Sequence, residues 1–212
     1  MKLKYYLHIL FFIVAVLYLI GFKNKSKAYK TFSLFLIINV TLNFISDRLY
    51  PWFKIYNHFF INIIFLFQFG MLSLFYSYSF DSKKCRNLVE ILLILVVGYL
   101  STKYLVFPES FFVFHYQDIY ITVFPVIVYS VMYLYSEYDK PQELYYANLG
   151  ILMYLIMNFL NYITWPLHSI SIDHTYMIEF NKTLNKSVQI LDPLGFVFSF
   201  FLFYQLKKLK TK

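Results

Sequence analysis

The sequence predicts an all-α membrane protein, a polytopic bundle of about seven transmembrane helices, and three observations lead to this fold class. Only 14% of the 212 residues are charged, whereas a soluble domain carries about 25% because water must wet its surface. Hydrophobic residues make up 60% of the chain and aromatic residues 24%. The apolar residues form long continuous runs, not the alternating pattern of a membrane barrel. Lipid tolerates no unpaired backbone groups, so such runs favour helices.

Seven apolar runs are candidate spans, because crossing the hydrocarbon core takes about 20 residues. The runs at 58–80, 119–136 and 145–168 are the clearest, whereas the run at 31–46 is short and contains Asn39 and Asn43. The basic residues before the first run resemble a secretory signal, but the run exceeds the usual apolar core of such signals, so we expect a retained helix. We predict one transmembrane domain over 1–212, with spans at 5–22, 31–46, 58–80, 88–106, 119–136, 145–168 and 188–206.

The distribution of basic residues predicts the orientation of this bundle. Lys and Arg prefer the cytoplasmic side of a membrane. With seven spans, an outer N-terminus places Lys83, Lys84 and Arg86 inside, together with the lysines after the first span and those of the C-terminal tail. We therefore expect the N-terminus outside and the C-terminus in the cytoplasm. A composition rich in Phe, Tyr, Ile, Asn and Lys favours a bacterial source. The expected location of the protein is then the cell (inner) membrane.

Three short segments carry a resemblance to a known group of proteins. They are Asn57-His58-Phe59-Phe60, Phe67-Gln68-Phe69 and Gly150-Ile151-Leu152-Met153-Tyr154, followed by a variable loop and an aromatic last run. In these the chain resembles small, uncharacterised seven-span bacterial integral membrane proteins. The resemblance implies a seven-helix fold and carries no established activity.

Several chemistries lack their sequence signatures. The chain contains no phosphate-binding P-loop, dinucleotide fingerprint, kinase motif or HExxH. No lysine lies within 187–206, where a retinal protein would need one, so we expect no retinal. The net charge of +8 is divided among clusters at the ends of apolar runs, a pattern typical of membrane flanks, and we expect no direct binding of nucleic acid. An enzymatic activity is less favoured than a non-enzymatic role.

Polar residues at membrane depth usually face the interior of a bundle. In the 145–168 run, Tyr154, Asn158, Asn161 and Trp165 follow helical spacing and form one stripe. Two interpretations remain open: hydrogen bonds that join helices, or a pocket for a neutral or zwitterionic ligand. The pocket candidates are Asn43, Asn62, Tyr129, Tyr154, Asn158, Asn161 and Trp165.

A histidine and carboxylate group on the outer side is a speculative metal site. In the predicted topology His115, Asp118, His168 and His174 share that side, and imidazole with carboxylate suits zinc or another transition metal. The alternatives are a sensor of external pH and scattered residues of the membrane interface. None of the spacings matches a zinc signature.

The favoured function is a sensory or regulatory accessory module without enzymatic activity, embedded in the bilayer and touching a protein partner at its cytoplasmic face. The lack of catalytic motifs, the short inner loops and the basic tail lead to it. Three alternatives remain: a small-solute transporter or pore, a membrane accessory of a phage-defence (CRISPR-type) system, and a lipid-modifying membrane enzyme. An oligomer is compatible with each.

Overall fold

A computed structural model describes residues 2–20, 22–55, 58–113, 115–136, 144–164 and 194–210, and every regular element within these ranges is a helix. The predicted all-α class is therefore confirmed. The elements are α1 (Lys2–Leu19), the short 3-10 helix η1 (Phe22–Asn24), α2 (Lys27–Phe53), α3 (His58–Ser79), α4 (Lys83–Val106), α5 (Pro108–Phe111), α6 (Tyr116–Ser136), α7 (Tyr145–Thr164) and α9 (Leu194–Lys210).

Four helices, α2, α3, α4 and α6, are long and apolar enough to cross a membrane. Two shorter apolar stretches, His8–Leu19 in α1 and Tyr145–Ile156 in α7, accompany them. Each of the seven long helices overlaps one of the seven expected ranges. The start of the last range, 188–193, and the end of the sixth, 165–168, lie outside the described residues. A multi-pass helical architecture therefore agrees with the apolar runs.

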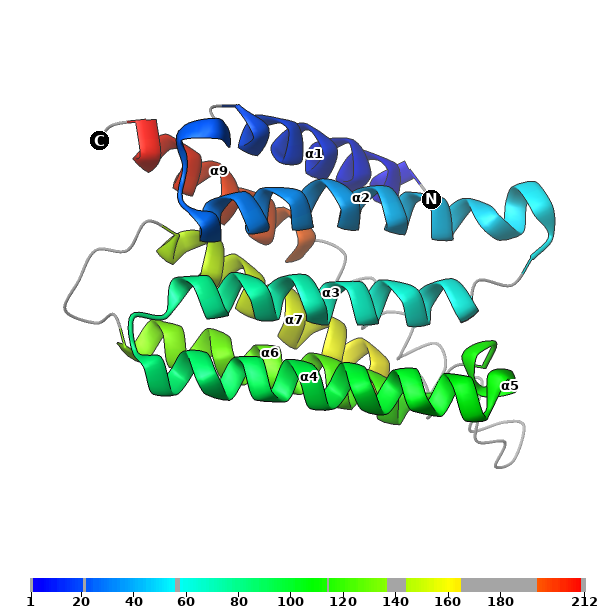
Figure 1. Ribbon diagram of the computed structural model, residues 1–212. Coiled ribbons are helices and arrows are strands. Elements are labelled where there is room, and N and C mark those ends of the chain that lie inside the picture. Colours follow the sequence, from blue (N-terminus) through cyan, green and yellow to red (C-terminus); the bar gives the residue numbers. More distant parts are fainter. Residues whose placement is uncertain are drawn as a thin grey trace.

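The long helices run up and down along a common direction, each opposite to the one before it (Figure 1). Six of them close into a ring in which each contacts its neighbours, in the order α1, α2, α3, α6, α7, α9 and back to α1. The seventh, α4, lies outside this ring and packs on α3 and α6. The ring is sealed between α9 and α1, where the Tyr18 hydroxyl donates to the Leu202 carbonyl at 3.1 Å.

Helix α2 is longer than the expected range 31–46, because the charged residues that follow Ser46 do not end it. The Oδ2 atom of Asp47 lies 3.3 Å from Nε2 of His8 on α1. The Arg48 guanidinium lies over the rings of Phe44 and Trp52. These contacts keep charged groups on a continuing helix. The helix continues to Phe53. The next residue, Lys54, takes the left-handed conformation (φ 58°) and donates its N–H to the Tyr50 carbonyl, a common C-terminal cap.

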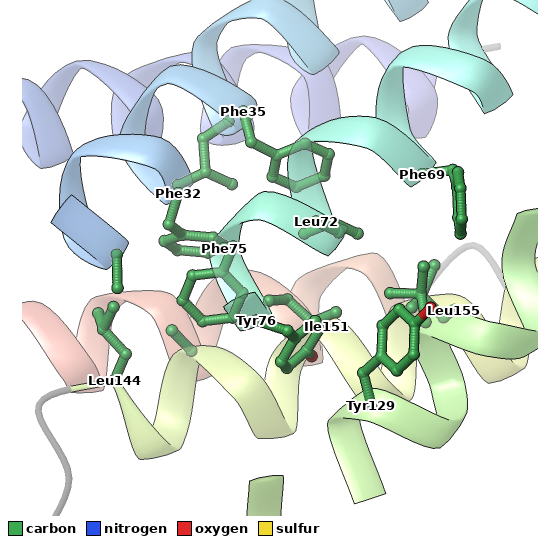
Figure 2. Packing of buried hydrophobic residues seen from close by; sticks show 14 of the residues in the cluster. Phe32, Phe35, Phe69, Leu72, Phe75, Tyr76, Tyr129, Leu144, Ile151 and Leu155 are labelled. Carbon is green, nitrogen blue, oxygen red and sulfur yellow. The ribbon is translucent and has the colours of Figure 1, made fainter. Parts of the chain in front are cut away.

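The interior of the ring is filled by aromatic and aliphatic side chains from facing helices (Figure 2). The Phe32 ring of α2 lies 5.5 Å from that of Phe75 on α3, and the Tyr76 ring lies 5.9 Å from that of Tyr129 on α6. Aromatic pairs at such separations contribute about 0.5–1.5 kcal/mol beyond the area they bury. Ile151 of α7 completes the cluster. With few alanines for close approach, this bundle packs through large rings.

Candidate functional site

The most polar buried contact in the described residues joins α4 to α6. The Lys103 ammonium lies 2.7 Å from both carboxylate oxygens of Asp118. The Tyr104 hydroxyl donates to the same carboxylate at 3.1 Å. Asp118 is 3% exposed, so its charge is compensated by protein groups and not by water. We call these three residues the α4–α6 clasp.

Local sequence places the clasp residues at helix ends that favour their charges. Lys103 is in the last turn of α4 and Asp118 in the first turn of α6, where the helix dipole stabilises a cation and an anion respectively. The short helix α5 makes the connection between them. It begins with Pro108, whose fixed φ and missing N–H suit a first helical position. The Ser110 hydroxyl donates to the Phe107 carbonyl at 2.7 Å, which tightens this turn.

Asn62 of α3 holds the same turn from the other side. Its amide nitrogen donates to the carbonyls of Phe111 and Val113, at 2.8 and 3.0 Å. The Phe111 ring also lies edge-on to Tyr104, 5.3 Å away. The predicted pocket residue Asn62 therefore satisfies backbone groups of the α5 turn, and through that turn it supports the clasp.

The geometry of the clasp suits a charge-dependent link between helices. Bringing two ions out of water costs several kcal/mol each, and their attraction offsets this only while both are present and hydrogen-bonded. Loss of either charge, or separation of the two groups by movement of α4, leaves the remaining charge buried without compensation. A buried ionisable pair on a helix that is apolar enough to cross a membrane is a functional-site candidate.

The structure describes two of the four residues of the predicted metal site, His115 and Asp118. Asp118 directs both oxygens at the Lys103 ammonium, whose positive charge repels a metal ion. The Nε2 atom of His115 is buried and has no hydrogen-bond partner. His168 and His174 lie outside the described residues. In the ranges that the structure describes, no three His, Cys, Asp or Glu side chains are grouped as metal ligands. The metal site at His115, Asp118, His168 and His174 therefore stays a prediction.

The remaining pocket candidates do not converge on one place within the described part of the chain. Asn43 donates to the Asn39 carbonyl one turn earlier in α2, at 2.8 Å. Tyr129 is fully buried in the core between α3 and α6. Tyr154 stacks on Phe198 of α9, with ring centroids 5.1 Å apart. Trp165 and the side chains of Asn158 and Asn161 lie outside what the structure describes.

A second polar cluster, which the sequence analysis did not single out, lies in the core. Asn148 of α7 accepts hydrogen bonds from Tyr76 of α3 and Ser130 of α6, at 2.5 and 2.9 Å, and donates to the Ser130 carbonyl at 3.1 Å. All three residues are completely buried. We call them the core triad. Asn148 lies close to a charged loop in the sequence, and only its position after Leu144 in a helical pattern indicates that it faces inward.

Helix α4 has the least buried surface of the long helices that could cross a membrane. Ile94 is 72% exposed, Leu95 61% and Leu105 81%. Besides the clasp, one described polar contact ties it to the ring: the Ser77 hydroxyl of α3 donates to the Glu90 carboxylate at 2.6 Å. Helix α4 is thus a peripheral element held near each end by a charged side chain.

Comparison of the chain with protein-family models, curated proteins and solved structures found no match. The class of protein defined by the fold is a helical bundle with several helices able to cross a membrane.

Proposed function

We propose that the chain is a multi-pass integral membrane protein that acts as a sensory or regulatory module without enzymatic activity. In this proposal all seven long helices span the cell (inner) membrane of a bacterium. The N-terminus is outside, the C-terminus is in the cytoplasm, and α4 carries the signal between the two faces. The observation that carries it is the α4–α6 clasp, a buried ion pair on a helix that is otherwise loosely packed.

The exposed surface of α4 supports the membrane placement. Ile91, Ile94, Leu95 and Leu105 are all more than half exposed along one helix. Monomeric soluble proteins rarely leave such a continuous apolar strip uncovered. In a bilayer the strip meets lipid chains.

The charges at the two ends of the bundle support the orientation. One end, where α2 and α4 begin and α9 finishes, has ten basic and two acidic residues in the described helices and turns; we call it the basic end. The opposite end has five basic and three acidic residues. The ten are Lys23, Lys25, Lys27, Lys30, Lys83, Lys84, Arg86, Lys207, Lys208 and Lys210, and the two are Asp81 and Glu90. The five are Lys2, Lys4, Arg48, Lys54 and Lys103, and the three are Asp47, Glu109 and Asp118. The excess of Lys and Arg favours a cytoplasmic basic end.

The position of the clasp on α4 supports a regulatory role. Lys103 is close to the outer end of the helix in this orientation, and Cys85 is in its first turn at the basic end. The two residues are 18 positions apart, which corresponds to about 27 Å of helix. A change that breaks the clasp outside would release one end of α4 and alter the packing of its other end inside. In this proposal α4 alternates between a clasped and a released arrangement, which is what coupling between distant sites requires.

The filling of the ring favours regulation over transport. The hypothesis of a solute path needs polar space between the helices of the ring. In the described residues that space holds Phe32, Phe75, Tyr76 and Tyr129, packed ring against ring. The core triad adds polar atoms, but these bond to one another.

The native thiol of Cys85, which is half-buried, permits a direct test. Alkylation of Cys85 by a maleimide is measured in inside-out membrane vesicles for the wild type and for Asp118→Asn, which removes the charge and keeps the size. If α4 carries the signal, loss of the clasp changes the alkylation rate severalfold.

The matched control is Asn148→Ala, which weakens the core triad without touching α4. It separates a specific effect on α4 from general loosening of the bundle. An unchanged rate in Asp118→Asn, or equal changes in both variants, would remove the proposed role of α4.

A further inference from the structure

The basic end carries more positive charge than the stability of its helices calls for. Neither α2 nor α4 has an acidic residue in its first turn. The first turn of α4 instead contains Lys83, Lys84 and Arg86, and that of α2 contains Lys27 and Lys30. Cations at the N-terminal end of a helix oppose its dipole, which costs stability. A cost repeated on two helices points to a negative partner outside the bundle.

Aromatic rings lie beneath several of these ammonium groups. Lys25 lies 5.5 Å from the ring centre of Tyr29, and Lys27 lies 6.0 Å from that of Tyr78. Tyr78 belongs to the last turn of α3 and is half exposed, so this contact joins the start of α2 to the end of α3. Two further pairs complete the set: Lys30 with Phe22 at 5.9 Å and Lys208 with Tyr146 at 4.8 Å.

These rings set the depth at which the charges lie. Amphipathic aromatic rings occupy the boundary between the hydrocarbon and the headgroups of a bilayer. In the membrane placement proposed above, ammonium groups that lie on such rings are close to the level of the lipid phosphates. Cation–π contacts of this kind also stabilise the lysine side chains in these positions.

The charges also surround the bundle. They come from η1 and α2, from α9, and from α4, and Figure 1 shows α4 on the opposite side of the bundle from α1 and α9. A compact acidic protein would contact one side of such an arrangement. A leaflet that surrounds the bundle contacts every side.

We propose that the basic end binds anionic phospholipid headgroups, with the Lys25, Lys27 and Lys30 group as its principal site. This inference rests on the membrane placement proposed above. Each basic residue near an anionic leaflet contributes about fivefold in affinity, so the three lysines together contribute about 100-fold.

The test uses the purified full chain in nanodiscs of phosphatidylcholine, with and without phosphatidylglycerol. Retention of phosphatidylglycerol is measured by native mass spectrometry and thermal stability by loss of helical circular dichroism. We expect phosphatidylglycerol to be retained and to raise the melting temperature. The triple variant Lys25→Gln, Lys27→Gln, Lys30→Gln should lose about 100-fold in affinity, and the corresponding Lys→Arg variant should keep it.

Lys54→Gln is the matched control, because Lys54 also lies over a ring, that of Tyr50, but at the opposite end of the bundle. Its lipid preference should equal that of the wild type. Equal retention of phosphatidylglycerol by the triple Gln variant would overturn the inference. The same would follow from equal stabilisation by inorganic phosphate in phosphatidylcholine, or from selective binding of an acidic peptide alone.

A separate measurement distinguishes failure of this inference from failure of the membrane placement. Washing native membranes with sodium carbonate releases peripheral proteins and leaves integral ones. Release of the chain would overturn both ideas. Retention without a phosphatidylglycerol preference would overturn only the lipid site.

Discussion

The Tyr76 hydroxyl on α3 donates a hydrogen bond of 2.5 Å to the side-chain oxygen of Asn148 on α7, 72 residues further along the chain. The same oxygen accepts from Ser130 on α6. One amide therefore joins three helices at the centre of a core otherwise made of rings and aliphatic side chains. Apolar packing alone distinguishes poorly between different rotations of a helix about its axis. A buried amide distinguishes them, because it meets its hydrogen-bond partners in only one of these rotations.

The core triad predicts that Asn148→Leu is more harmful than Tyr76→Phe. The first removes the side-chain oxygen that accepts from both the Ser130 and the Tyr76 hydroxyls, whereas the second removes one donor only. Hydrogen bonds between membrane helices contribute about 0.6 kcal/mol on average and up to about 1.7, so we expect a loss of about 1–2 kcal/mol for Asn148→Leu and less than half of that for Tyr76→Phe. Unfolding in mixed micelles followed by circular dichroism measures both. Equal losses would mean that Asn148 contributes only volume.

The clasp predicts strong coupling between Lys103 and Asp118. Replacing Lys103 by Met or Asp118 by Leu leaves a charge buried without its partner, and we expect a loss of about 2–4 kcal/mol from each. The double variant should recover most of this, because two apolar side chains replace two ions. A double-mutant cycle on the free energy of unfolding gives the coupling directly. Additive losses would show that the two side chains act independently.

Two glycines give a matched pair for the seam between α7 and α9. A Cβ on Gly150 would lie 2.7 Å from the Phe198 ring and 3.3 Å from Phe201, whereas a Cβ on Gly98 of α4 meets nothing within 4 Å. Phe198 is buried and stacked on Tyr154, so its ring has little room to move. We expect Gly150→Ala to cost about 1–3 kcal/mol and Gly98→Ala to stabilise by up to about 1 kcal/mol through helix propensity. Melting temperatures of both variants in one detergent test this, and a stabilised Gly150→Ala would contradict the packing.

The proposed orientation predicts which side of the membrane Cys85 faces. In intact cells a membrane-impermeant maleimide should leave Cys85 unlabelled and should label it after permeabilisation. A reporter fused after Lys212 should be active only in its cytoplasmic form. A single cysteine introduced at Glu109, which is exposed at the opposite end, provides the control and should be labelled in intact cells. Labelling of Cys85 before permeabilisation would reverse the orientation.

The positions of the helices were predictable, because continuous apolar runs and helix length are local properties of the sequence. The contacts between residues of different helices were not predictable from such local properties. The charged Asp47 and Arg48 marked the end of a run, yet they lie on the same helix because His8 and Trp52 are close to them in space. The spacing of Tyr154 predicts a helix face, but which neighbour that face meets depends on how seven similar helices pack. Nothing local to Tyr154 specifies Phe198.

The same limit explains the site. Asp118 was singled out for its neighbours in the sequence, the histidines. Its partner in space is Lys103, fifteen residues earlier and across the α5 turn. A lysine near the end of an apolar run, such as Lys103, usually reaches toward water. Only the path of the turn, fixed by Pro108 and by Asn62, brings the two together.

Closure of the ring between α9 and α1 constrains the order in which this protein is assembled. During synthesis α1 emerges first, and Tyr18 gains its Leu202 partner only after nearly two hundred further residues have been made. Until then the faces of α1 and α7 that pack on α9 are uncovered, and the ring of helices is open between them. Both of these faces are contacted by α9 in the complete fold. A ribosome that stalls before α9 would therefore leave two helix faces uncovered, and they would stay so until the last helix packs.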